Sequence, residues 1–375
     1  MRFNVSSSAL FTALQTVSKV IASKNTLPIL DSFLFDLEGE KLTITASDVE
    51  TRLITTLDVL NVEGSGQFTI DSKRFLDTLK ELSEQPLTIE VNDDNMEMNV
   101  EYFNGKFVIP GHSGDAYPQQ KPLKESAISI MLESQILLSG INRSFFAMGE
   151  DELRPVMNGV YFDFYPENLT IVASDGHKLM RLSIFTVQAE EHSSFILPRK
   201  PANMLKNLLL RNADSVTVSF DENNAHVKTA TFEMICRLIE GRYPNYNAVI
   251  PVDNPNLATI DRVSFLMALK RVSPFTSQSS GLVKIELAEN EIAIYAQDID
   301  FSTSAEERIE CQYSAEPLRI GFKVSCLIDI LTNISSDNVI FQLADPSRSG
   351  VLVPAGNKEN EDLLMLLVPL TLNDY

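Results

Sequence analysis

Leu42-Thr-Ile-Thr-Ala-Ser-Asp48 is a strand-like segment that recurs twice further along the chain, as Leu169-Thr-Ile-Val-Ala-Ser-Asp175 and as Ile292-Ala-Ile-Tyr-Ala-Gln-Asp298. In each copy an alternating apolar and polar pattern ends in an aspartate. The three aspartates lie 127 and 123 residues apart. Because intervals of this size divide the 375 residues into thirds, the sequence predicts an internal triplication.

Two further markers repeat at nearly the same intervals. Lys73, Lys200 and Lys323 each open a helical stretch and are again 127 and 123 residues apart. Tyr117-Pro118 recurs 126 residues later as Tyr243-Pro244. Since the three markers agree, we predict three domains over residues 1–124, 125–250 and 251–375.

Each repeat shows the same order of elements: a helix, alternating strands, a second helix and more alternating strands. The predicted first helices cover residues 6–24, 133–148 and 261–278, and the predicted second helices cover residues 71–85, 198–213 and 323–335. Period-2 alternation, as in Leu87-Thr-Ile-Glu-Val91, marks the strands. Regular alternation of strand and helix is missing, so we predict an α+β fold with two helices against antiparallel sheets in each domain. Polar, proline-containing stretches at 111–125 and 249–257 are the predicted linkers.

The composition excludes several classes of protein. The net charge is −20, which excludes a wholly basic surface of the kind used for tight nucleic-acid binding. The longest apolar runs, such as Leu363 to Leu370, are far shorter than the about 20 residues that cross a bilayer. The N-terminus lacks the apolar stretch of a secretory signal. Three widely spaced cysteines suggest neither a disulfide framework nor a zinc site. We therefore expect a cytoplasmic protein.

The basic residues are concentrated in the predicted helices. These six segments hold 14 bases and 7 acids, so the rest of the chain carries a charge of −27. Segment 198–213 is the extreme case, with Arg199, Lys200, Lys206 and Arg211 and no acid. Each base taken alone is compatible with an ordinary solvated helix. If the helices share one surface, however, that surface is basic, and without interleaved aromatics it is suited to phosphate contact rather than base reading.

A catalytic interpretation of Ser174-Asp175-Gly176-His177 is weaker than a structural one. Neighbouring residues rarely converge into a triad, and the sister repeats have no equivalent histidine. A turn that ends a strand explains the same residues. The four histidines are scattered and show no metal-ligand spacing, and no phosphate-binding glycine loop is present in the sequence. We therefore predict no catalytic residue, no metal and no cofactor.

The apolar C-terminal run, Leu363 to Leu372, allows two interpretations. Pro369 cannot donate to a strand ladder, so a final edge strand over 363–367 is the simpler one. In the other, Val368-Pro369-Leu370 leaves the sheet and lines a groove for an apolar peptide.

The chain also resembles the family of bacterial sliding clamps, the β subunits of DNA polymerase III holoenzyme, from Met1 to Leu372. The segments that carry the resemblance are Thr26-Leu-Pro-Ile-Leu30, Met157-Asn-Gly159, Ser174-Asp-Gly-His-Lys-Leu179, Leu197-Pro-Arg-Lys200, Glu240-Gly-Arg-Tyr-Pro-Asn-Tyr246 and Val368-Pro-Leu-Thr-Leu372. No segment is decisive alone, but their order and spacing together are specific.

The resemblance implies a head-to-tail homodimer that closes into a ring, with helices inside and sheets outside. Such a ring would encircle duplex DNA and slide along it without sequence specificity, as a non-catalytic processivity factor. It would tether the polymerase III catalytic subunit, the clamp loader, repair polymerases, and ligase or mismatch-repair proteins through short apolar motifs. A scaffold for other proteins, without DNA, is the alternative for the same triplicated domains, and an enzyme is a distant third.

The resemblance also implies roles for particular residues. The implied DNA-contacting residues are Lys24, Lys73, Arg74, Arg199 and Lys200. The implied partner-peptide pocket, between the second and third domains, consists of Met157, Ser174, Gly176, His177, Lys178, Leu179, Pro244, Val249, Val368, Pro369 and Leu370. The residues implied at the dimer interface are Phe107, Ile109 and Phe275.

The chain departs from the family pattern around this pocket. Thr371 stands where an arginine is usual, Asn373-Asp374-Tyr375 extends beyond the usual end, Ala248 replaces a basic residue and Pro155-Val156 replaces an aromatic pair. These differences concern peptide preference more than the presence of the pocket. The segment 133–148 carries only Arg143 as a base, so the resemblance implies an unevenly charged ring lining.

Overall fold

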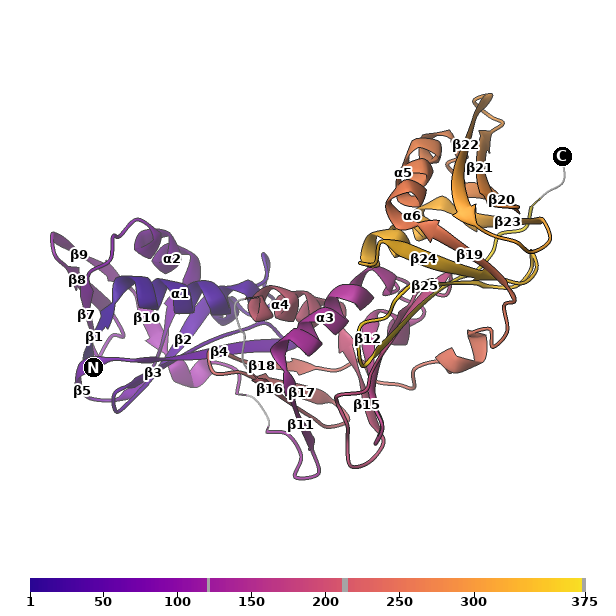
Figure 1. Cartoon of the computed structure of the whole chain (residues 1–375). Coiled ribbons are helices and arrows are strands. Elements are labelled where there is room, and N and C mark those ends of the chain that lie inside the picture. The colour runs from indigo at the N-terminus through magenta and orange to yellow at the C-terminus, as the bar shows by residue number, and fades with distance from the viewer. Residues whose placement is uncertain (120–121, 211–214, 373–375) are drawn as a thin grey trace. The chain divides into compact units, whose positions relative to one another are not determined.

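The computed structural model describes residues 1–119, 122–210 and 215–372 (Figure 1). By its contacts the chain forms two compact units. The first unit comprises Met1–Leu137 and Asn203–Leu238, and the second comprises Leu138–Ala202 and Ile239–Tyr375. The central repeat therefore contributes residues to both units. The C-terminal extension, 373–375, lies outside the described residues. The last residues of the predicted helix 198–213 lie outside them as well.

Each of the six predicted helices is present in the described residues, and each is shorter than predicted. The α-helices are α1 (Ser7–Val17), α2 (Ser72–Lys80), α3 (Ser134–Ser144), α4 (Arg199–Leu209), α5 (Arg262–Val272) and α6 (Val324–Asn333). The 3-10 turns are η1 (Ser18–Val20), η2 (Pro28–Asp31), η3 (Gly114–Ala116), η4 (Phe145–Ala147), η5 (Pro155–Met157), η6 (Tyr246–Val249) and η7 (Ser273–Phe275). Three predicted first helices thus end in a tightened turn, η1, η4 or η7.

Side-chain caps fix where several of these helices begin. The Ser6 hydroxyl accepts the Ala9 N–H at the start of α1, at 3.1 Å. Asp71 accepts the Arg74 N–H at the start of α2, and Asp261 accepts the Ser264 N–H at the start of α5, at 2.9 and 2.7 Å. Each cap satisfies a backbone donor that the first turn leaves unpaired.

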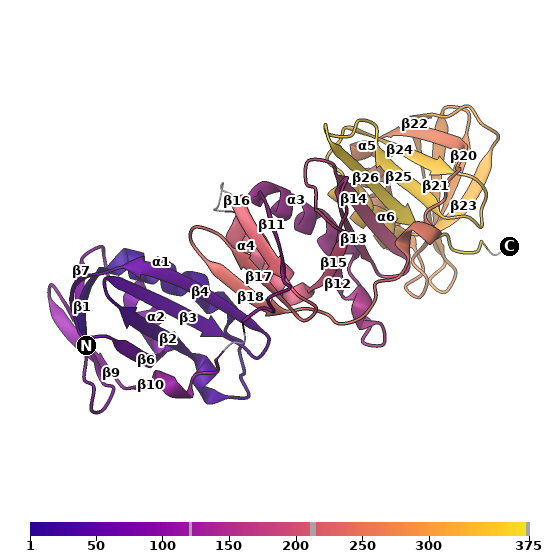
Figure 2. The ribbon, with the colours of Figure 1, turned by 90° about the horizontal axis from the view of Figure 1, so that it is seen from below.

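The first unit contains a five-stranded and a nine-stranded antiparallel sheet, part of which is visible in Figure 2. The five-stranded sheet runs in the order β5 (Leu60–Glu63), β1 (Arg2–Ser6), β7 (Pro86–Val91), β8 (Met98–Tyr102), β9 (Gly105–Ile109). The nine-stranded sheet runs in the order β10 (Gly111–Ser113), β6 (Gly66–Asp71), β2 (Ser32–Glu38), β3 (Lys41–Ser47), β4 (Thr51–Asp58), β18 (Glu233–Arg237), β17 (Asn224–Lys228), β16 (Ser215–Phe220), β11 (Ile128–Glu133). The predicted linker 111–125 therefore contains the short elements β10 and η3.

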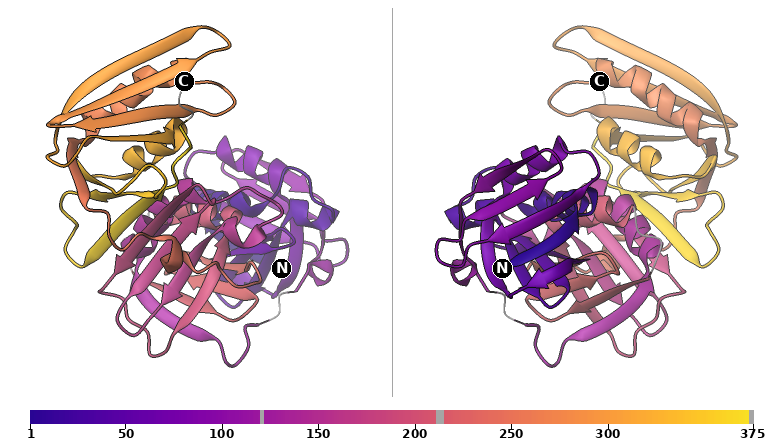
Figure 3. Two further views of the ribbon diagram at one scale, coloured as in Figure 1. Left: turned by 90° about the vertical axis from the view of Figure 1, so that its right-hand side faces the viewer. Right: turned by 90° about the vertical axis from the view of Figure 1, so that its left-hand side faces the viewer.

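The second unit contains one twelve-stranded sheet, with α5 and α6 packed together beside its strands (Figure 3, orange). Its order is β15 (Ser193–Pro198), β12 (Gly159–Phe164), β13 (Leu169–Ser174), β14 (Lys178–Ile184), β26 (Glu361–Leu367), β25 (Gly350–Pro354), β24 (Asn338–Leu343), β19 (Asn256–Asp261), β22 (Thr303–Gln312), β21 (Glu291–Asp298), β20 (Leu282–Ala288), β23 (Leu318–Lys323). Every pairing between these strands is antiparallel, as predicted.

The period-2 strands bury one set of side chains against the helices. In the first unit, Phe35 stacks on Phe68 at 5.0 Å and lies 6.1 Å from Phe75 of α2. Leu10 and Leu14 of α1 are fully buried in the same unit. The fold therefore rests on apolar burial between sheet and helices, which is the α+β arrangement that the sequence predicts.

The prediction of an edge strand over 363–367 is wrong in its position. The strand β26 forms, but it lies inside the sheet, paired with β14 on one side and β25 on the other. Its residues Leu363, Met365, Leu366 and Leu367 are buried, as expected for an interior strand. Pro369 stops the strand without making it an edge, because the proline lies beyond the last paired residue.

Candidate functional site

The three repeated aspartates form the same turn in each repeat. The Asp175 Oδ1 atom accepts the N–H groups of His177 and Lys178, at 2.8 and 2.9 Å. Asp48 accepts those of Glu50 and Thr51 at 2.7 and 2.6 Å, and Asp298 accepts those of Asp300 and Phe301. The turn interpretation of Ser174-Asp175-Gly176-His177 is therefore confirmed.

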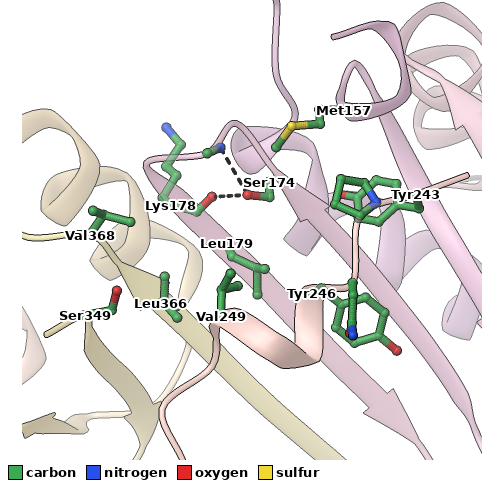
Figure 4. Close-up of a pocket in the computed structure, with 13 residues that line it drawn as sticks. Met157, Ser174, Lys178, Leu179, Tyr243, Tyr246, Val249, Ser349, Leu366 and Val368 are labelled. Atoms are coloured by element: carbon green, nitrogen blue, oxygen red, sulfur yellow. Dashed lines mark hydrogen bonds between the residues drawn. The ribbon is translucent and has the colours of Figure 1, made fainter.

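Backbone geometry at this turn also explains why a serine stands at position 174 and a glycine at position 176. The Ser174 hydroxyl donates to the Lys178 carbonyl at 2.9 Å and accepts the Gly176 N–H at 3.1 Å (Figure 4). Gly176 has a φ of +91°, in the region where a side chain is strained. His177 is exposed, and its carbonyl accepts the Val368 N–H at 2.9 Å. The hydroxyl is thus engaged with the backbone, and the motif holds the end of β13 against the start of β14.

Beside this turn lies a pocket of about 230 Å³ within the second unit, which we call the apolar pocket (Figure 4). Its floor consists of Leu179 and Leu366, which face each other across the β14–β26 pair and are 3% and 2% exposed. Val249 and Val368 stand at its rim, 56% and 37% exposed. A buried apolar floor under an exposed apolar rim is suited to an apolar side chain of a ligand.

Eight of the eleven residues predicted for the peptide pocket line this cavity. They are Met157, Ser174, Gly176, Lys178, Leu179, Pro244, Val249 and Val368. His177, Pro369 and Leu370 are not among the lining residues. The Leu370 N–H donates to the Gly321 carbonyl at 2.8 Å, so the chain turns towards β23 after Val368. The lining residues that sequence reasoning missed are Tyr243, Asn245, Tyr246, Ser349 and Leu366.

A buried carboxylate holds one wall of the apolar pocket. Asp163 is 2% exposed and accepts the hydroxyl of Tyr246 at 2.9 Å and that of Tyr165 at 2.9 Å. The Tyr161 hydroxyl donates to it at 3.2 Å, and His192 Nε2 lies 2.8 Å from its Oδ1. These bonds fix Tyr246, whose ring lines the pocket, against β12. The segment 243–249 is thereby positioned over the sheet.

The two tyrosines that line the pocket, Tyr243 and Tyr246, both pack against Tyr161, and all three are neutral. Tyr161 and Tyr243 lie 4.6 Å apart with nearly parallel rings. Burial raises the pKa of Tyr161 to about 12, and burial together with the Asp163 carboxylate raises the pKa of Tyr246. Burial likewise raises the pKa of Tyr243. Since phenols with raised pKa keep their protons, this wall carries no charge near neutral pH.

Lys178 is the one charged residue in the lining, and carboxylates of its own unit compensate its charge. Its Nζ lies 2.6 Å from Asp329 of α6 and 3.8 Å from Asp175, and 5.6 Å from the Phe146 ring centre. Burial alone would lower its pKa, but the Asp329 hydrogen bond and the nearby negative charges outweigh burial and raise it. The apolar pocket therefore offers apolar contact and little net charge.

The predicted DNA-contacting residues differ in their surroundings. Lys24, Lys73, Arg74 and Lys200 are exposed. Arg199 is half-buried and donates to the Met148 carbonyl at 3.1 Å. Its guanidinium also lies 5.2 Å from the Phe145 ring centre and 3.4 Å from Glu150. Arg199 thus has a structural role at the start of α4.

The described residues also bear on metal sites and membrane-spanning helices. No group of three or more His, Cys, Asp or Glu is placed to hold a metal ion among residues 1–119, 122–210 and 215–372. Across those same residues, every helix falls short of the length and apolar character needed to span a membrane.

Comparison with known proteins identifies the family. Residues 1–121 match the N-terminal domain of the DNA polymerase III beta subunit, residues 131–245 match its central domain, and residues 247–368 match its C-terminal domain. The chain is 27% identical to the beta sliding clamp of Pseudomonas putida, covering 97% of this chain and 99% of that protein. It is 28% identical to the beta sliding clamp of Haemophilus influenzae, covering 99% and 100%.

Solved structures give the same result. The DNA polymerase III subunit beta of Pseudomonas aeruginosa superimposes with a TM-score of 0.93 at 25% identity, covering 99% of this chain and 100% of that one. A sliding clamp of the same organism bound to griselimycin superimposes with a TM-score of 0.92 at 25% identity, with the same coverage. The fold and the three matched domains define a sliding clamp. The chain belongs to the family of DNA polymerase III beta subunits, non-catalytic processivity factors of DNA replication.

Proposed function

We propose that two copies of this chain close head to tail into a ring around duplex DNA in the cytoplasm, slide without sequence specificity and tether partners through the apolar pocket. The partners are the polymerase III catalytic subunit, the clamp loader, repair polymerases, and ligase or mismatch-repair proteins. In this proposal each subunit has three domains, over residues 1–124, 125–250 and 251–375.

The observation that supports the ring is a strand pairing between successive repeats. The chain forms this pairing twice, and the strands that would form it a third time lack a partner within the described residues. Strand β4, after the first repeated aspartate turn, pairs with β18, the last strand of the second repeat. Strand β14, after the second turn, pairs with β26, the last strand of the third repeat. The third members of these series are β22, after the third turn, and β9, which precedes only the short strand β10 at the end of the first repeat. Among the described residues, β9 pairs with β8 alone, and Thr303–Glu310 of β22 pairs with β21 alone. A second copy can supply each missing partner.

Side chains near the two open edges support this pairing. Phe107 of β9 is half-buried and lies 6.4 Å from Phe75, and Phe275 beside β22 is 36% exposed. Ile109 is 2% exposed, so its side chain packs in its own unit and its backbone is the part that serves the edge. The β22 strand carries Glu306, Glu307 and Glu310 with one arginine, whereas β9 carries Lys106. Opposite charges on the two strands favour their association.

A matched pair of substitutions tests the ring. Val108 on β9 is 49% exposed, and Leu60 on β5, the other edge of the same sheet, is 67% exposed. Val108→Glu would place a new carboxylate against the acidic β22 of a second copy, and Leu60→Glu makes the same chemical change at the opposite edge. We expect sedimentation velocity to show a dimer for wild type and Leu60→Glu and a monomer for Val108→Glu. Negative-stain images should show closed rings only for the first two. A dimer that Val108→Glu leaves intact would contradict the assignment of β9.

For DNA, we propose that Lys24, Lys73, Arg74, Arg199 and Lys200 contact phosphates, with Arg199 also fixing the start of α4 through its bond to the Met148 carbonyl. The six α-helices of the described residues hold ten lysines and arginines and two aspartates, which supports a basic helical surface. Such contacts are salt-sensitive and carry no sequence information. Reversal of Lys24, Lys73 and Lys200 to glutamate should reduce polymerase processivity and loading onto circular DNA. Unchanged polymerase stimulation would favour the scaffold alternative.

For the partners, we propose that the apolar pocket receives apolar side chains of a short peptide. Its floor of Leu179 and Leu366 and its rim of Val249 and Val368 support this role, with Met157 and Pro244 completing the walls. His177, Pro369 and Leu370 would act at its margin, where His177 and Val368 are joined by a backbone hydrogen bond. The binding of griselimycin by a Pseudomonas aeruginosa clamp provides a competitor for the test, because displacement of a bound peptide is then measurable.

A further inference from the structure

A second cavity, of about 460 Å³, lies in the first unit beside the turn at Asp48. Its lining includes Leu30, Arg52, Pro118, Ile235 and Arg237. This cavity is separate from the apolar pocket, which lies in the second unit.

The second cavity occupies the place in the first unit that the apolar pocket occupies in the second. Each lies beside an aspartate turn, where the Ser47 hydroxyl donates to the Thr51 carbonyl as Ser174 donates to Lys178. Each lies over a pair of strands that joins two repeats, β4 with β18 or β14 with β26. The correspondence therefore extends from the repeat in the sequence to the cavity itself.

Strand register gives the correspondence residue by residue. Arg52 faces Ile235 as Leu179 faces Leu366. The Arg237 N–H donates to the Glu50 carbonyl at 2.8 Å, as the Val368 N–H donates to His177 at 2.9 Å. Pro118 stands in the place of Pro244, as the repeated Tyr-Pro pair indicates.

The exchange of residues changes the chemistry of the cavity. Arg52 replaces a floor leucine and Arg237 replaces a rim valine. Apolar surface remains, since Leu27 and Val49 in the lining are 49% and 74% exposed. The second cavity thus combines apolar contacts with a cation at its base, whereas the base of the apolar pocket is two leucines and its one cation, Lys178, is paired with Asp329.

The surroundings of Arg52 leave its charge without a partner carboxylate. Its Nη2 donates to the Pro118 carbonyl, and its guanidinium lies 5.8 Å from the Tyr117 ring centre. In the parts of the chain that the structure describes, Arg52 makes no ion pair. Burial lowers its pKa, as expected for a cation that is partly withdrawn from water. Two carboxylates, Asp48 and Glu50, also line the cavity: the Asp48 Oδ1 atom accepts two turn N–H groups, and Glu50 is exposed.

We propose that the second cavity binds a short peptide segment of a partner protein that carries apolar side chains and one carboxylate, with the carboxylate held by Arg52. A guanidinium binds a carboxylate through parallel hydrogen bonds, and this interaction strengthens where water is excluded. Leu30 and Ile235 supply the apolar contacts. The chain would then carry two peptide sites of different preference, one neutral and one acidic.

Two labelled peptides with blocked termini test the proposal. The acidic probe is Leu-Leu-Asp-Leu-Leu and the neutral probe is Leu-Leu-Asn-Leu-Leu, each with a benzophenone group for photocrosslinking. On the full-length protein, mass spectrometry should locate the acidic probe on peptides around residues 47–52. The neutral probe should bind there about tenfold more weakly, the factor expected for loss of one charge-assisted pair.

Substitutions at Arg52 separate its charge from its structural role. Arg52→Leu introduces the residue that the apolar pocket holds at the equivalent place, so the fold should tolerate it. We expect this variant to lose the preference for the acidic probe, and Arg52→Lys to keep part of it. Equal labelling by both probes in wild type, or an unchanged preference in Arg52→Leu, would overturn the proposal. Displacement of the acidic probe by duplex DNA alone, with no preference between peptides, would overturn it in favour of a phosphate contact.

The outcome is independent of the apolar pocket. Val249→Ala alters that pocket and should leave crosslinking around residues 47–52 unchanged. Loss of both signals in Val249→Ala would show that the probes share one site and would also contradict the second site. Failure of the acidic site with intact binding in the apolar pocket leaves the proposed function standing.

Discussion

Val249→Ala is the substitution that tests the apolar pocket most directly. The Val249 side chain is 56% exposed at the rim and therefore contributes little to the core. Replacing it with alanine removes two carbon groups, each worth about 0.8 kcal/mol when fully buried. A ligand that covers the exposed part of the side chain would lose about 0.9 kcal/mol, which is about a fivefold increase in Kd.

Val252→Ala is the matched control, because it makes the same chemical change three residues further on. Val252 is 99% exposed and does not line the pocket. Fluorescence anisotropy with the neutral peptide should show the fivefold loss for Val249→Ala and wild-type affinity for Val252→Ala. Competition with griselimycin should show whether the peptide and this compound share a site.

Two outcomes would refute the reasoning. Wild-type affinity of Val249→Ala would mean that the ligand does not cover the rim. An equal loss of peptide affinity in both variants would mean that the segment 249–252 contributes through its general apolar character rather than through the pocket. The two variants should have the same thermal midpoint, so a fall in stability of Val249→Ala would also contradict the assignment of Val249 to an exposed rim.

Three further predictions concern the framework of the site. Leu366→Ala should destabilise the protein by about 2 to 5 kcal/mol, because this floor residue is 2% exposed; urea unfolding measures this, and a loss below about 1 kcal/mol would contradict its place in the core. Asp163→Asn should raise amide hydrogen exchange in the segment 243–249, and Tyr246→Phe made in that background should add little, because both changes remove the same bond; additive effects would mean that the two side chains act separately. The stability that Tyr117 and Tyr161 contribute should be complete below about pH 10 and be lost between about pH 10 and 12, because burial raises their pKa from 10.0 to about 12 and the unfolded chain therefore releases those protons first; buried Cys236, whose pKa is raised from 9.0 to about 12, adds to the fall, and urea midpoints that stay level over this range would contradict it.

The repeat in the sequence predicted the turns and strands well because local chemistry determines them. Asp48, Asp175 and Asp298 bond to backbone N–H groups two and three residues away, so a short segment contains the whole structure. The helix starts at Ser6 and Asp71 were equally local. The helix ends were overestimated because 3-10 turns continue the same apolar spacing beyond the α-helix.

The pairing of strands from different repeats could not be predicted from the sequence of any single repeat. β26 became an interior strand because its second partner, β14, comes from the preceding repeat. Pro369 correctly predicted where strand β26 ends. It wrongly predicted an edge position for that strand, because the second partner strand could not be foreseen. After Val368 the chain turns towards β23, because the Leu370 N–H bonds to the carbonyl of Gly321, a partner that no local pattern indicates.

The Asp163 network left no signal in the sequence. Tyr246 lies 83 residues from Asp163, and only the sheet and the turn η6 bring the two together. Tyr243 could have been found, since it stands beside the predicted Pro244 in a pair that repeats Tyr117-Pro118 at the junction of two repeats. Extending that argument from the proline to the tyrosine would have added a lining residue.

The floor of the apolar pocket is also the joint between two repeats, and this has a consequence for drug resistance. Leu179 and Leu366 pair across the β14–β26 seam, so a substitution that repels an inhibitor from the floor also loosens the joint. We expect resistance mutations against a pocket-directed antibiotic to be confined to exposed positions such as Val249, where a change costs little folding energy. An inhibitor that draws its affinity from the two leucines would leave few substitutions that both weaken its binding and preserve the fold.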